Sequence, residues 1–75
     1  MDRAWLGRVL SKMSPDYKHI VTWHSEVSGC DWLICVFNRK GKELDVTFVD
    51  QGELSKIEIY FLARKIVNVY KHMED

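Results

Sequence analysis

Two short glycine-containing segments divide the middle of this chain into three runs of strand length, and this division constrains the fold more than any other feature. Residues 28–30 read Ser-Gly-Cys and residues 39–42 read Arg-Lys-Gly-Lys, both typical of tight turns. The runs beside them, residues 19–27, 32–37 and 43–49, are rich in β-branched and aromatic residues. Because short turns join antiparallel neighbours, the sequence predicts a three-stranded antiparallel meander.

The apolar pattern also predicts a register for this meander, because the side chains of a strand alternate between two faces. With the tip of the second hairpin at Lys40-Gly41 and a three-residue first turn, Cys35 lies opposite Val46 on one side and Trp23 on the other. This register gives a sheet with one wholly apolar face, which we expect to form the core. The predicted core face consists of Val21, Trp23, Leu33, Cys35, Phe37, Leu44, Val46 and Phe48.

A stretch with helical periodicity lies on each side of the meander. Between residues 4 and 13 apolar side chains recur at helical spacing, with Asp2 placed to cap the helix and Pro15 to end it. Further along, Ser55 and Glu58 have the spacing of a capping box. The core stripe predicted for this second helix is Ile59, Leu62, Ala63, Ile66, Val69, Tyr70 and Met73. The sequence thus predicts an α+β domain of order αβββα, with both helices packed on one face of the sheet.

Length and composition limit the chain further. Seventy-five residues are too few for two cores, so we expect a single domain over residues 1–75. A hydrophobic content of 47% argues against disorder, and 11 basic against 11 acidic residues argue against a broad positive field for nucleic acid. The longest apolar run, residues 32–37, is far shorter than a membrane span, and the start does not read as a signal peptide. We therefore expect a cytoplasmic protein.

The second helix carries a segment that resembles a known family. Residues 55–58 read Ser-Lys-Ile-Glu and residues 63–65 read Ala-Arg-Lys, which is similar to the second-helix signature of the double-stranded RNA-binding domain. The order αβββα resembles the same family over nearly the whole chain. The resemblance implies contacts with duplex RNA through the first helix, the first inter-strand loop and lysines that begin the second helix. Lys56 matches the first of these lysines, whereas Ile57 and Tyr60 stand at the next two positions.

Two apolar groups have no place in the predicted core, and each is a candidate docking surface. One group lies on the second helix, away from its core stripe, and the other runs along the central strand on the predicted outer face of the sheet. Exposed apolar patches with a charged rim are typical of partner sites, although central strands also keep apolar residues that are half exposed. The residues predicted to bind a protein are Ile57, Tyr60, Phe61, Arg64, Trp32, Ile34 and Val36.

No group of residues has the spacing of a catalytic, metal or phosphate site. The histidines His19, His24 and His72 are separated from sets of cysteines or carboxylates. Ser25 follows His24, but neighbouring residues of a strand point to opposite faces and cannot form a nucleophile and base pair. Cys35, predicted to face the core, is expected to be an inert small side chain. We therefore expect no enzyme activity, no metal and no cofactor.

These observations predict a small non-catalytic protein-protein interaction module. We expect a free-standing inhibitor or regulator of a larger assembly, of the kind that phages and mobile elements encode, such as the anti-CRISPR proteins. Two alternatives stay open, a module that binds double-stranded RNA and a homodimerisation domain. The residues that would contact RNA phosphates are Arg39, Lys40, Lys42 and Lys56. The expected ligand is thus a protein partner or a second copy, with no membrane and no small-molecule substrate.

Overall fold

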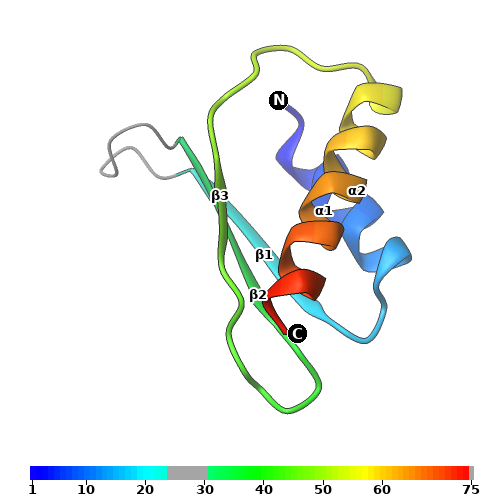
Figure 1. Ribbon diagram of the computed structural model, residues 1–75. Coiled ribbons are helices and arrows are strands. Elements are labelled where there is room, and N and C mark those ends of the chain that lie inside the picture. Colours follow the sequence, from blue (N-terminus) through cyan, green and yellow to red (C-terminus); the bar gives the residue numbers. More distant parts are fainter. Residues whose placement is uncertain (24–30, 75) are drawn as a thin grey trace.

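The structure, a computed structural model, describes residues 1–23 and 31–74. Its elements are α1 (Arg3–Met13), β1 (Lys18–Trp23), β2 (Trp32–Phe37), β3 (Val46–Phe48) and α2 (Lys56–Met73). The three strands form one antiparallel sheet in the order β1-β2-β3, and both helices lie on the same face of it (Figure 1). The predicted α+β fold of order αβββα is therefore confirmed. The predicted turn at residues 28–30 and the end of the first predicted strand lie outside the described residues.

Both helices begin at the predicted capping residues. The Oδ1 atom of Asp2 accepts a hydrogen bond from the Trp5 N–H at 3.0 Å, which satisfies one of the free amides of the first turn of α1. In α2 the Ser55 Oγ accepts from the Glu58 N–H at 3.2 Å, and the Glu58 Oε1 accepts from the Ser55 N–H at 2.9 Å. This reciprocal pair is the predicted capping box.

The register of the sheet differs from the prediction, and Asn38 explains the difference in the second hairpin. The Asn38 N–H donates to the Lys42 carbonyl at 3.0 Å, and the Asn38 Oδ1 accepts from the N–H groups of Lys40 and Lys42, each at 2.9 Å. The hairpin therefore closes over a three-residue loop, with Gly41 at a φ of 81°. The prediction had a two-residue tip, so Val46 pairs with residue 34 and not with residue 35.

This shift exchanges the two faces of β2. Trp32, Ile34 and Val36 face the helices and are buried, so the prediction that they form an outer docking face is wrong. Their neighbours Leu33, Cys35 and Phe37 point to the opposite face and are only partly buried, so the predicted core positions of all three are wrong. A one-residue slip moves every side chain of a strand to the other face, so one turn decides both corrections. In the first hairpin, Val21 pairs with Ile34 in place of Phe37, a shift of three residues.

The core lies between the sheet and the two helices, and its composition shows how α2 is oriented. The buried stripe of α2 contains Val67, whereas Val69 and Met73, which the prediction placed in the core, are each 48% exposed. Val67 lies beside Met13 at the end of α1, so the buried arc of α2 is turned toward α1. The buried cluster is Leu6, Val9, Leu10, Ile34, Val36, Leu44, Val46, Ile59, Leu62, Ala63, Ile66, Val67 and Tyr70.

An aromatic row closes the core at one end of the sheet. The Trp32 ring lies between Trp23, whose centroid is 5.0 Å away in an edge-on arrangement, and Phe48, whose centroid is 6.4 Å away with nearly parallel planes. The Trp32 Nε1 donates to the Asp50 Oδ1 at 3.4 Å, and the Asp50 N–H donates to the Asp31 Oδ2 at 2.8 Å. The row thus connects all three strands and the segment that follows β3.

The corrected faces of β2 can be tested by comparing two neighbouring truncations. Ile34→Ala removes a fully buried side chain beneath the helices, so we expect a loss of about 2–5 kcal/mol of unfolding free energy. Leu33→Ala removes a partly exposed side chain from the other face, so a clearly smaller loss is expected. Urea titrations measure both losses, and Ile34→Val supplies the same comparison at about 1 kcal/mol if the alanine variant does not fold. A larger loss in Leu33→Ala would contradict the register.

Candidate protein-binding surface on α2

The outer face of α2 carries large apolar side chains that the fold does not bury. Ile57 and Phe61 lie one helical turn apart on the side opposite the buried stripe, and their side chains are 69% and 54% exposed. Tyr60 lies beside them and is 47% exposed, and Arg64 is exposed one turn further along. We call these four residues the outer α2 surface. The predicted exposure of all four is confirmed.

Two aromatic rings give this surface a defined shape. The rings of Tyr60 and Phe61 lie edge to face, with their centroids 5.9 Å apart and their planes at 76°. Such a contact contributes about 0.5–1.5 kcal/mol beyond burial and limits the rotation of both rings. An aromatic pair that is already ordered loses less side-chain entropy when a partner covers it. The outer α2 surface is therefore partly preorganised for contact.

A shallow hollow adjoins the outer α2 surface on the side that faces α1. It has a volume of about 210 Å³, and Tyr60 and Arg64 form part of its wall together with Met13, Val67 and Asn68. The outer α2 surface and the hollow thus share Tyr60 and Arg64, so one partner can contact both. Met13 was missing from the predicted site, because it comes from α1 and only the packing of the helices brings it there.

The charges along α2 make the rim of this surface basic. Lys56, Arg64, Lys65 and Lys71 stand on the helix against a single acidic residue, Glu58. The Glu58 carboxylate is occupied by the capping box, where the hydrogen bond from the Ser55 backbone lowers its pKa. The Nζ of Lys56 lies 4.7 Å from the centre of the Trp5 ring, where cation and ring attract each other. A partner with acidic side chains around an apolar centre would complement this surface.

The four residues predicted to contact RNA phosphates do not form one patch. Arg39, Lys40 and Lys42 belong to the β2–β3 loop at one end of the molecule, whereas Lys56 begins α2 at the other end (Figure 1). The Arg39 Nη2 forms an ion pair with the Asp16 Oδ1 at 2.7 Å. Three of the predicted RNA contacts are thus together, and the fourth lies far from them.

A second hollow, of about 490 Å³, lies beside that loop, and its polar side chains hold the end of α2 in place. The Tyr17 hydroxyl donates a short hydrogen bond to the Glu74 Oε1, and the Asn38 Nδ2 donates to the Glu74 Oε2 at 3.2 Å. The bond to Glu74 raises the pKa of Tyr17 to about 12 and lowers the pKa of Glu74. These contacts connect the hairpin to the C-terminal end of α2, which is a structural role.

His19 is a partly buried titratable group that links the sheet to α2. Its Nε2 lies 2.9 Å from the Tyr70 hydroxyl, and the two rings are 5.6 Å apart. Burial lowers the pKa of His19 below the ordinary value of 6.5, because removal of water disfavours the charged ring. His19 therefore packs as a neutral side chain against Tyr70 of α2.

Cys35 lies close to two carboxylates on the outer face of the sheet, a grouping that sequence reasoning missed. Its Sγ and one oxygen each of Glu43 and Asp45 all lie within 4.8 Å of one another. Burial and then the two acidic neighbours raise the pKa of Cys35, so the free thiol is a weak nucleophile at neutral pH. The grouping depends on the register, which the sequence predicted with Cys35 on the other face.

Comparison with protein-family models gives no match, and comparisons with curated proteins and with solved structures give none either. Within the described residues, neither helix combines the length and the apolar character that crossing a bilayer requires. The surfaces of the chain itself are therefore the basis on which a function can be proposed.

The burial of His19 predicts how the stability of the fold depends on pH. Because its pKa is lowered in the folded protein, the unfolded chain binds more protons once the pH falls below about 6.5. Its contribution to stability is thus complete above the unfolded pKa, and it is lost as the pH falls toward the folded pKa. We expect the unfolding free energy of His19→Gln to fall less than that of the wild type between about pH 7.5 and 5.5. Urea titrations at each pH measure this, and parallel curves would contradict the assignment.

Proposed function

We propose that this chain is a small non-catalytic module that binds a protein partner through the outer α2 surface. The observation that carries the proposal is the exposure of Ile57 and Phe61 on the side of α2 opposite the core, with Tyr60 exposed beside them. Folding gains little from large apolar side chains at these positions, because about half or more of each residue's surface contacts water. A solvated helix face ordinarily carries charged or polar residues there, so a binding role accounts for the pattern.

The chemistry of this surface indicates the kind of partner that it fits. Covering an apolar side chain fully is worth about 1.5–3 kcal/mol, so Ile57 and Phe61 are the expected anchors of the contact. Arg64, at the edge of this surface, is placed to pair with an acidic group as the apolar area is covered. The surface therefore fits a groove or helix with an apolar centre and an acidic rim.

A domain of this size can act by occupying part of a larger molecule. The polar side chains brought together around Tyr17 and Glu74, and around His19 and Tyr70, hold the elements of the fold to one another. We therefore propose that the module is an inhibitor or regulator of a larger assembly, of the kind that phages and mobile elements encode. Blocking such an assembly needs one complementary surface and no chemical step.

Recognition of duplex RNA is the contrasting possibility, and the double-stranded RNA-binding domain is the family whose resemblance motivates it. It would depend on phosphate contacts from the β2–β3 loop, where Lys40 and Lys42 are exposed. Lys56 would have to act from the other end of the molecule, and it is already placed over the Trp5 ring. Protein binding through the outer α2 surface uses residues that already lie together on one helix, so we rank it first.

The proposal predicts that two changes on the outer α2 surface abolish partner binding without unfolding the domain. Ile57→Lys with Phe61→Lys should weaken binding to the purified partner by at least about 100-fold, because two anchors worth about 3 kcal/mol or more in total are lost. The stability of the variant should fall by no more than about 1.5 kcal/mol, the upper value of the lost contact between the Tyr60 and Phe61 rings. The partner is obtained by affinity capture from host cells, and its binding is then measured by isothermal titration calorimetry.

A matched control exists on the same helix. Val69→Lys with Met73→Lys places the same two charges at apolar residues of similar exposure that lie outside the outer α2 surface, so it should bind the partner like the wild type. Equal binding by both double variants would contradict the proposal. So would salt-sensitive binding to duplex RNA that is lost with Lys40→Glu and Lys42→Glu and kept with the Ile57 and Phe61 changes.

A further inference from the structure

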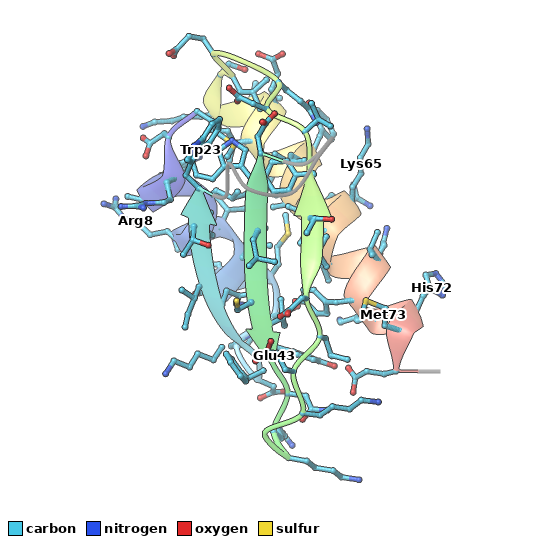
Figure 2. All side chains as sticks on the ribbon, turned by 90° about the vertical axis from the view of Figure 1, so that its left-hand side faces the viewer. Arg8, Trp23, Glu43, Lys65, His72 and Met73 are labelled. Atoms are coloured by element: carbon cyan, nitrogen blue, oxygen red, sulfur yellow. The ribbon has the colours of Figure 1, made fainter. Side chains whose placement is uncertain are left out.

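The face of the sheet that points away from the helices carries an ordered arrangement of charge and apolar surface. Figure 2 looks onto this outer sheet face, with the helices behind it and Glu43 toward its lower end. The outward side chains follow from the observed register, since both helices lie on the other face. They are Lys18, Ile20 and Thr22 on β1, Leu33, Cys35 and Phe37 on β2, and Glu43, Asp45 and Thr47 on or before β3.

Across the hairpin end of the outer sheet face, one basic side chain, Lys18, lies at the β1 edge, apolar side chains lie in the middle, and the acidic Glu43 and Asp45 lie at the β3 edge. In the transverse row at the hairpin end, Lys18 pairs with Phe37 and Phe37 pairs with Glu43. In the next row, Cys35 has Ile20 as its cross-strand partner on one side and the carboxylate of Asp45 on the other. Ile20 on β1 is 42% exposed and the outward side chains of β2 are partly exposed, so both strands present apolar surface to water.

This arrangement is complementary to itself. A two-fold axis parallel to β2 that passes above the central side chains would place β1 of one copy over the β3 side of the other. Lys18 of each copy would then face Glu43 of the second copy, while the apolar middle would meet its own counterpart. Two sheets pack in this way at a distance of about 10 Å, with their strands within about 30° of each other. The contact is isologous and closes as a dimer.

Within the described residues, the carboxyl groups of Glu43 and Asp45 contact each other and form no ion pair with a lysine or arginine of the same copy. Glu43 and Asp45 bring two carboxylates close together, and the ion pair that the described part of the chain contains is elsewhere, between Arg39 and Asp16. Lys18 stands at the opposite edge of the same row, with Phe37 between it and Glu43. A lysine from a second copy would supply the missing positive charge.

From these observations we infer that the outer sheet face is a self-association surface. A second copy of the chain docks on it about a two-fold axis, with Lys18 of each copy facing Glu43 of the other. This surface is independent of the outer α2 surface, which lies on the other layer. Three strands at about 4.8 Å spacing over five residues cover roughly 250 Å² of sheet, well below the ~800 Å² per partner of a standard interface. The dimer therefore forms at high protein concentration and dissociates on dilution.

The decisive experiment uses two single charge reversals, Lys18→Glu and Glu43→Lys, studied apart and mixed. Each variant alone places like charges in both contacts of the dimer, so its association constant should fall at least about tenfold. In an equimolar mixture the two variants restore both contacts, so a heterodimer should form about as well as the wild-type dimer. Sedimentation velocity up to about millimolar concentration measures the association, and native mass spectrometry identifies the heterodimer.

Further outcomes of the association measurements would contradict the inference. Ile57→Lys with Phe61→Lys should leave self-association unchanged, and loss of the dimer in that variant alone would assign it to α2 instead. Association that requires a divalent cation and disappears with EDTA would mean that a metal, bound near Cys35 and its carboxylates, joins the copies. A wild-type protein that stays monomeric at millimolar concentration, or a mixture that forms no heterodimer, would overturn the inference.

In a Cys30→Ser background Cys35 is the single thiol, and the proposed axis passes close to it. A short bis-maleimide should therefore join two copies at a rate that falls with dilution and with Lys18→Glu. Failure of the dimer would leave the proposed binding through α2 untouched, because that binding is measured with the partner and with a different pair of variants.

Discussion

The backbone and side chain of Asn38 fix the alignment of the second hairpin, and most of the structure depends on this alignment. By holding the N–H groups of Lys40 and Lys42 on one carboxamide oxygen, Asn38 closes a loop of three residues. The odd loop length decides which face of β2 meets the helices. Ile34 and Val36 thereby fall under α1 and α2, and the core is assembled around them.

The same alignment decides what the domain shows to its surroundings. Phe37 and Cys35 are directed to the open side of the sheet, next to the acidic groups of Glu43 and Asp45. The outer α2 surface arises differently, because a helix has one buried arc and everything opposite that arc is exposed. The molecule thus has two unlike faces. One is the outer α2 surface with its basic rim, and the other is the outer sheet face, with Lys18 at one edge and the carboxyl groups of Glu43 and Asp45 at the other.

The elements and their order could be predicted because local signals are strong. The Asp2 cap and the capping box of Ser55 and Glu58 mark the helix starts. The buried stripe of α2 leaves Ile57 and Phe61 on the opposite side of the helix, independently of the register of the sheet. The register could not be predicted in the same way. All six residues of β2 are apolar, so either face could form the core, and Arg-Lys-Gly-Lys accommodates loops of two or three residues. The place of Val67 in the core depends on where α1 lies against α2, which no local pattern specifies.

The row of rings at the end of the sheet has a spectroscopic consequence. The indoles of Trp23 and Trp32 belong to adjacent strands and lie 5.0 Å apart at nearly a right angle, so their ultraviolet transitions couple. Coupled indoles give a split circular-dichroism signal that vanishes when the rings separate. The split signal therefore reports on the separation of β1 from β2. Trp5 lies against Lys56, so its own ultraviolet signal depends on the position of the start of α2. Separation of the two strands and events at the helix can thus be followed separately, without any added dye.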